Sequence, residues 1–103
     1  MAALLVLSLL PAPAAGVTFD SLTTPPVELT GLVYQPPVSG PFPAVVLRHG
    51  CSGIIRTELE WAAELRKMGY VALIVESFRP RGHKEICTDF KRVARQERVL
   101  DAY

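Results

Sequence analysis

The stretch VVLRHGCSG, residues 45–53, places a histidine, a cysteine and a serine beside two glycines, directly after an apolar run. These residue types could supply a nucleophile and its base, because an imidazole can take the proton of a thiol or hydroxyl that attacks a carbonyl carbon. A nucleophile elbow requires Gly-x-Ser-x-Gly or its cysteine equivalent. With Ser52 at the centre, Ile54 stands where the second glycine should be. With Cys51 at the centre, His49 replaces the first glycine. The spacing therefore argues against a nucleophile in this loop.

The backbone of the same loop offers a different chemistry. Gly50 and Gly53 follow the apolar run, and glycines allow a backbone to approach a ligand at low steric cost. Main-chain N–H groups in such a loop can stabilise the oxyanion of an acyl-transfer intermediate, which is worth about 3–4 kcal/mol per donor. On this interpretation Cys51 acts through its amide and not through its thiol. A tight turn that only reverses the chain explains the spacing equally well.

A second loop, ESFRPRGHKEIC at residues 76–87, also carries polar side chains. Arg79 and Arg81 are candidates for binding a substrate carboxylate, because the guanidinium group forms bidentate pairs with carboxylates. The alternative is a solvated basic loop whose arginines bond to nearby carbonyl groups, since exposed charges usually contribute little.

The chain contains two cysteines, Cys51 and Cys87. They end up on neighbouring loops if the strands before those loops are adjacent, so we expect a disulfide in an oxidising compartment and two thiols elsewhere. A metal is the alternative, because His49, Cys51, His83 and Cys87 could form a four-ligand zinc set. Neither His–Cys pair has the usual Cys-x2-Cys spacing, and we predict neither a metal nor a cofactor.

The apolar patterns predict an α/β fold with strands at residues 27–34, 44–47 and 70–75. The second and third are continuous apolar runs, which are typical of strands buried on both faces of a parallel sheet. The Pro-rich segment at residues 35–43 is a loop, and residues 17–26 are predicted to be an extended leader. Too few strands are present for a complete sheet with both faces covered. We therefore expect these strands to be the N-terminal part of a larger sheet.

Two helices are expected from capping and periodicity. Thr57 and Glu60 have capping-box spacing, and Gly69 can end the first helix in a left-handed conformation. The apolar periodicity of residues 89–103 predicts a second helix. The apolar face of the first helix is assigned to Trp61, Leu65 and Met68, and that of the second to Phe90, Val93, Ala94 and Leu100. Strands that alternate with helices in this way indicate right-handed crossover units.

Residues 1–16, MAALLVLSLLPAPAAG, resemble a signal peptide. The apolar run is too short for a membrane span and ends in Pro and small residues, although no basic residue precedes it. We therefore predict export, periplasmic or secreted, of one domain at residues 17–103, with a cytoplasmic protein as the alternative. The formal net charge of +1 argues against nucleic acid as a partner.

Taken together, GPFPAVVLRHGCSG, WAAELRKMGYVALIVESFRPRG and the following Cys87 resemble the N-terminal half of a protein of the dienelactone hydrolase family. The resemblance implies a partial α/β-hydrolase fold, three-layered with a mostly parallel sheet, and cleavage of small carboxylic esters or lactones without a cofactor. The resemblance implies that the family's first oxyanion donor maps onto the backbone N–H of Cys51, with His49 and Gly50 shaping its turn. Glu76 departs from the family's usual Asp at the end of its strand.

The same resemblance predicts that residues 1–103 are an incomplete enzyme. In this family the nucleophile elbow, the catalytic acid and the catalytic histidine follow the helix that includes Tyr103, so the chain alone should be inactive. A small secreted metal-binding or ligand-binding module that uses the two-His, two-Cys set is the alternative function. A truncated reading frame with no function of its own is a third interpretation.

Overall fold

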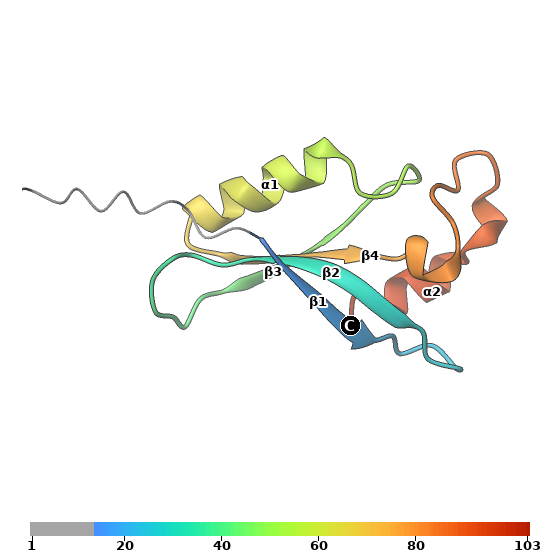
Figure 1. Ribbon diagram of the computed structural model, residues 1–103, viewed down its shortest axis with the longest axis horizontal. Coiled ribbons are helices and arrows are strands. Elements are labelled where there is room, and N and C mark those ends of the chain that lie inside the picture. Colours follow the sequence, from blue (N-terminus) through green and yellow to red (C-terminus); the bar gives the residue numbers. More distant parts are fainter. Residues whose placement is uncertain (1–13) are drawn as a thin grey trace, which may run out of the picture.

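The computed structural model describes residues 14–103 and contains a four-stranded sheet with one long helix packed on it (Figure 1). Residues 1–13, which hold most of the predicted signal peptide, lie outside the described part. The elements in chain order are β1 (Ala15–Asp20), β2 (Glu28–Tyr34), β3 (Ala44–Arg48), α1 (Arg56–Lys67), β4 (Val71–Glu76), the 3-10 turns η1 (Arg79–Arg81) and η2 (Phe90–Arg92), and α2 (Arg95–Leu100).

The sheet is mixed, with strand order β1-β2-β4-β3. β1 pairs with β2 and β2 pairs with β4 in antiparallel fashion, and only β3 and β4 are parallel. The expectation of a mostly parallel sheet is therefore wrong for the described residues. The connections explain the difference: the short turn between β1 and β2 can join only antiparallel strands, whereas the α1 crossover makes β3 and β4 parallel.

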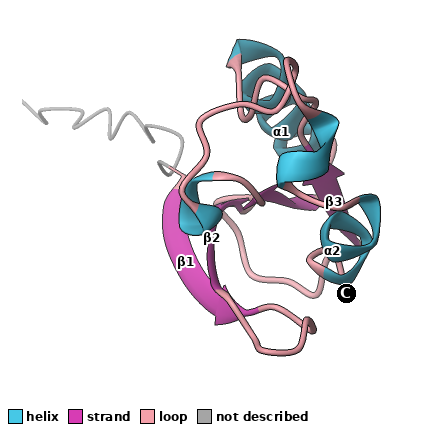
Figure 2. Ribbon diagram, turned by 90° about the vertical axis from the view of Figure 1, so that its right-hand side faces the viewer, coloured by secondary structure: helices cyan, strands magenta, loops and turns pink. Residues whose placement is uncertain are grey.

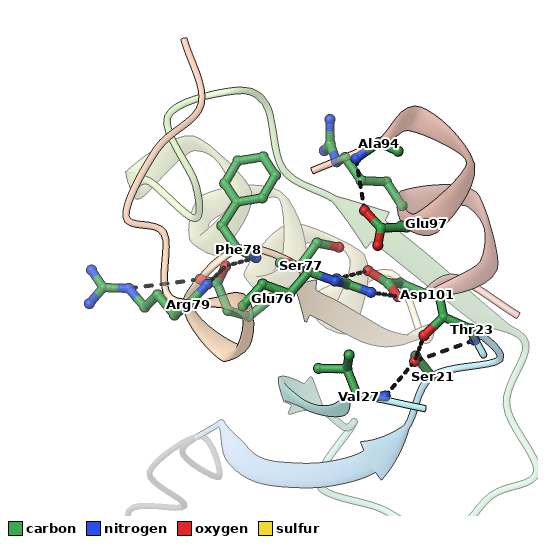
Figure 3. A network of polar contacts seen from close by, with 12 residues as sticks. Ser21, Thr23, Val27, Glu76, Ser77, Phe78, Arg79, Ala94, Glu97 and Asp101 are labelled. Atoms are coloured by element: carbon green, nitrogen blue, oxygen red, sulfur yellow. Dashed lines mark hydrogen bonds and ion pairs between the residues drawn. The ribbon is translucent and has the colours of Figure 1, made fainter. Parts of the chain in front are cut away.

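The first strand occupies residues that the sequence assigned to a signal peptide and an extended leader. β1 pairs in register from Ala15 opposite Val33 to Asp20 opposite Glu28, so the predicted boundary after residue 16 falls inside a strand. The hydroxyl of Ser21 organises the turn between β1 and β2 (Figure 3). Its oxygen accepts the N–H of Val27 at 2.9 Å, and the Ser21 N–H donates to the Val27 carbonyl at 2.8 Å.

The α1 helix covers one face of the sheet, and of the three apolar side chains expected on its inner face only Leu65 packs against the core. Trp61 and Met68 are 60% and 67% exposed, whereas Ala62 is fully buried against Ala72 and Ile74 of β4. The small Ala62 side chain lets the helix backbone lie close to the strand.

Both ends of α1 are capped locally. At the start, the Glu58 carboxylate accepts the Ile55 N–H at 2.9 Å, so the predicted Thr57–Glu60 capping box is wrong by two residues. At the end, Gly69 has φ of +90° and its N–H donates to the Arg66 carbonyl, which confirms the predicted left-handed glycine cap.

β3 is an edge strand and is not buried on both faces as its apolar run suggested. Its residues alternate between exposed and half-buried, because α1 covers only one face and no further strand pairs with its outer side among residues 14–103. The predicted three-layer arrangement is therefore met in part. The other helix, α2, lies beyond the carboxyl ends of β3 and β4 and forms no layer over the strands (Figures 1 and 2).

The predicted helix over residues 89–103 is interrupted. It consists of η2 and α2, separated by extended backbone at Val93, which has φ of −132° and ψ of 115°. Val93 is buried in a second apolar cluster with Phe78 and Ile86. The extended backbone brings this side chain into the cluster, whereas Phe90 on the same predicted helical face is exposed.

Candidate functional site

The loops after β3 and β4 lie side by side at the carboxyl edge of the sheet, the edge at which open α/β sheets bind their ligands. A disulfide joins Cys51 and Cys87, whose Cα atoms are 4.9 Å apart. The Ile86 N–H also donates to the Cys51 carbonyl at 2.9 Å. The predicted disulfide is confirmed, and it leaves neither sulfur as a thiolate nucleophile.

The loop after β3 forms a tight turn closed by a hydrogen bond from the Gly53 N–H to the Gly50 carbonyl at 3.2 Å. Gly53 has φ of +82°, and a Cβ atom there would stand 3.0 Å from the Lys84 carbonyl oxygen. A larger residue would therefore be both strained and crowded at this position. Within residues 14–103, the backbone N–H of Cys51 donates no hydrogen bond. The turn thus holds a free main-chain donor at the sheet edge.

His49 is buried beneath this turn and is fully engaged. Its Nδ1 lies 2.8 Å from the Gly50 carbonyl oxygen, and its Nε2 accepts the Ser77 N–H at 3.1 Å. Nδ1 needs a proton to donate to the Gly50 carbonyl, while Nε2 faces both the Ser77 N–H and, at 3.4 Å, Oε1 of Glu76. The ring also meets Phe78 edge-on, with centroids 4.4 Å apart. His49 therefore ties the two loops together and orients the turn that holds Cys51.

His49, Glu76 and Ser77 include the side-chain types of a catalytic triad, but their geometry does not form one. The Glu76 carboxylate, 3.4 Å away, and the Ser77 backbone N–H both face Nε2 of the histidine, while Nδ1 is occupied by Gly50. A triad needs the acid on one ring nitrogen and the nucleophile's hydroxyl on the other. No ring nitrogen is left to activate a serine, so this cluster is structural.

Glu76 closes the end of β4. Its Oε1 accepts the backbone N–H groups of Phe78 at 2.9 Å and Arg79 at 3.3 Å. Burial alone would raise the pKa of this carboxyl, but the contact with the His49 ring and the two backbone N–H groups outweigh burial and lower it. The sequence revealed Glu76 only as a departure from Asp. A carboxylate at a strand end followed by a polar turn was the signal available for its capping role.

The two arginines predicted to contact substrate differ in their exposure and in their ion-pair partners. Arg81 forms a bidentate pair with Asp101, at 2.7 and 2.9 Å, and also donates to the Ser77 carbonyl at 2.8 Å. The Arg81 side chain is 9% exposed and that of Asp101 is 1% exposed. The hydrogen bonds to Asp101 outweigh burial and raise the pKa of Arg81. Arg79 is 69% exposed, with its Nε 3.9 Å from a Glu76 oxygen. Of the two, only Arg79 is readily reached from solvent.

The four residues of the alternative zinc set do not assemble into a metal centre. Both sulfurs belong to the disulfide, and His49 is committed to Gly50 and Ser77. Across residues 14–103, no group of three or more His, Cys, Asp or Glu side chains is placed to hold a metal ion. The metal-binding alternative therefore gains no support from this geometry.

Comparison with known proteins is sparse. No protein-family model matches the chain, and no curated protein does. Among solved structures it is similar to a highly thermostable carboxyl esterase from Bacillus coagulans in complex with glycerol, with a TM-score of 0.47 and 14% sequence identity. The match covers 62% of this chain and 20% of that chain, so it spans about a fifth of the esterase's length. A likeness of this degree does not establish a family.

No helix among the described residues has the length and apolar character needed to cross a bilayer.

Proposed function

We propose that residues 17–103 are the N-terminal part of a carboxylic-ester or lactone hydrolase of the dienelactone hydrolase type. The observation that carries this proposal is the unpaired backbone N–H of Cys51, held at the carboxyl edge of the sheet by a closed turn. Three constraints fix this donor: the disulfide, the hydrogen bond from Ile86 to Cys51, and the buried ring of His49. A donor fixed before the reaction stabilises a developing oxyanion without a cost of reorganisation.

The proposed reaction is acyl transfer. A nucleophile supplied by residues beyond Tyr103 adds to the ester carbonyl carbon, and the carbonyl oxygen becomes an oxyanion that the Cys51 N–H stabilises. His49 and Gly50 position this donor and do not touch the reacting atoms. Arg79 is the candidate for contact with a substrate carboxylate. Arg81, held by Asp101, maintains the loop from which Arg79 projects.

The proposal includes inactivity of the 103-residue chain on its own. The sulfurs are oxidised, and the histidine beside Glu76 and Ser77 has no free nitrogen to serve as a base. We further propose an exported, oxidising location, because disulfides form and persist in such compartments.

A direct test measures hydrolysis by the protein purified from its source alongside the recombinant 103-residue chain, with 4-nitrophenyl butyrate and dihydrocoumarin as ester and lactone. The proposal predicts that the source protein is larger than 11.3 kDa by intact mass and hydrolyses at least one substrate, while the short chain does not. A source protein without esterase or lactonase activity would contradict it.

A further inference from the structure

A cavity of about 320 Å³ lies between the loop after Cys87 and the last helix. This volume is in the range of small-molecule sites. Its walls combine apolar and cationic side chains, contributed by Ile86, Phe90, Val93, Arg95 and Arg98. None of the residues of the turn that holds the Cys51 N–H lines this cavity, although Cys51 packs against the cluster to which Ile86 and Val93 belong.

Arg98 reaches this cavity without a carboxylate partner. One terminal nitrogen of its guanidinium donates to the His49 carbonyl oxygen, and the guanidinium carbon stands 5.0 Å from the centroid of the Phe78 ring. Its Nε atom is buried and makes no hydrogen bond within the described chain. Burial, and after it the charge of Arg48, lowers the pKa of Arg98, and Asp101 offsets this only in part. The positive charge is therefore poorly compensated.

The carboxylates around α2 are committed elsewhere. Both oxygens of Asp101 pair with Arg81, and Glu97 accepts the Ala94 N–H at 2.8 Å at the start of the helix. Arg95, on the cavity wall, forms no ion pair within residues 14–103. The cavity thus presents cationic groups beside an apolar wall, and no acidic side chain of the described chain lines it.

A ligand that fits must satisfy both features. A carboxylate can accept two parallel hydrogen bonds from a guanidinium group, and a hydrocarbon body can pack on the exposed Phe90 ring and on Ile86. A purely apolar ligand would leave the charge of Arg98 uncompensated, and a cation would be repelled. We infer that the Arg95–Arg98 cavity binds a small monocarboxylate with an apolar body. This inference goes beyond the proposed function and does not depend on it.

The test is an NMR titration of the 15N-labelled 103-residue chain with phenylacetate, and with phenylacetamide as the uncharged control. We expect saturable shifts at the amides of Val93, Arg95 and Arg98, with β1 amides unaffected. Hydrogen bonds to a charged group are worth about 1.5–3 kcal/mol, so phenylacetamide should bind about tenfold more weakly or worse. Equal affinity for the two probes, or no saturable shift at these amides, would overturn the inference.

Substitutions show which arginine binds the carboxylate of the ligand. Arg98→Gln should weaken phenylacetate binding about tenfold, and Arg95→Gln should weaken it by a smaller factor. Lys91→Gln, which removes a cation of η2 outside the cavity lining, is the matched control and should leave affinity unchanged. If Arg98→Gln does not fold, Arg95→Gln and the comparison of the two probes still test whether the cavity binds a carboxylate. An equal loss for Lys91→Gln and Arg95→Gln would show non-specific attraction and contradict the site.

Discussion

At the scale of single residues, the sheet edge is built from side chains that satisfy backbone groups. The His49 ring spans from the Gly50 carbonyl to the Ser77 N–H, and Glu76 caps the N–H groups after β4. Buried polar groups need such partners, because an unpaired one costs about 1–3 kcal/mol. The residues that look most like catalytic groups in this chain are therefore the ones that hold its loops in place.

Glu76 should make stability depend on pH. Its pKa in the folded protein lies below the ordinary value of 4.5, so folding favours the ionised form. The stabilisation is present above pH 4.5 and is lost as pH falls through the folded pKa. We expect Glu76→Gln to lower the free energy of unfolding by about 1–2 kcal/mol at neutral pH, and the difference from wild type to shrink in acid.

Urea unfolding of both proteins across the acid range measures this effect. Glu64→Gln, at an exposed carboxylate paired with Lys67, is the control and should change stability by less than about 1 kcal/mol. A loss for Glu76→Gln that is independent of pH would contradict the capping role of the carboxylate.

The two arginines of the second loop should respond differently to substitution. Arg81→Gln leaves the buried Asp101 carboxylate without its partner, which should cost about 3–5 kcal/mol. Arg79→Gln removes an exposed charge and should cost less than about 1 kcal/mol. Thermal or urea unfolding of the pair checks this. Equal losses would mean that Arg81 is not the structural member.

At the scale of elements, the two loops at the sheet edge are held in place by the strands before them and by one covalent bond. β3 and β4 are adjacent and parallel, so their carboxyl ends meet, and the bond between Cys51 and Cys87 joins the two loops that leave those ends. Cys51 also packs against the apolar cluster of Phe78, Ile86 and Val93, which helps to hold the two loops together.

Removing the disulfide should destabilise the chain. Its cysteines are 36 positions apart, and closing a loop of that length is worth about 3–4 kcal/mol in the loop-entropy model. We therefore expect the double variant Cys51→Ala, Cys87→Ala to lose that much free energy of unfolding. Urea denaturation of the non-reduced wild type and the variant measures it. A wild type that is no more stable than the variant would contradict the bond's role.

Strands and helix ends could be predicted where neighbouring residues in the sequence are enough to determine them. The apolar runs indicated β3 and β4, and Gly69 indicated the end of α1, because a left-handed residue is needed there. β1 could not be predicted, since its short sequence becomes a strand only by pairing with β2. The interruption of the predicted helix at Val93 could not be predicted from the sequence. It results from burial of Val93 against Phe78, which is a tertiary contact.

The same distinction applies to the site. The meeting of the Cys51 and Cys87 loops results from adjacent parallel strands, so the disulfide could be anticipated. The partner of Arg81 could not, because Asp101 is far along the chain and no local pattern links the two. Likewise, the roles of His49 and Glu76 depend on a contact between two loops that only the folded chain displays.

At the scale of the whole molecule, the described sheet ends on an unpaired, half-exposed strand, β3. Such an edge exposes backbone N–H and C=O groups that a further strand can pair with. The proposed hydrolase has its nucleophile, acid and base in segments after Tyr103, and a strand of such a segment would pair with this edge. We propose that the Cys51 N–H is the oxyanion donor of the complete hydrolase.

The most direct test compares two variants of the complete protein, Cys51→Pro with Cys87→Ala, and Cys51→Ala with Cys87→Ala. Both lack the disulfide, and only the first lacks the N–H at residue 51, which makes no internal hydrogen bond within residues 14–103. Circular dichroism and urea unfolding establish that the two are equally folded. We expect kcat/KM for 4-nitrophenyl butyrate to be about 10²- to 10³-fold lower in the proline variant. Equal kcat/KM values in two equally folded variants would contradict it.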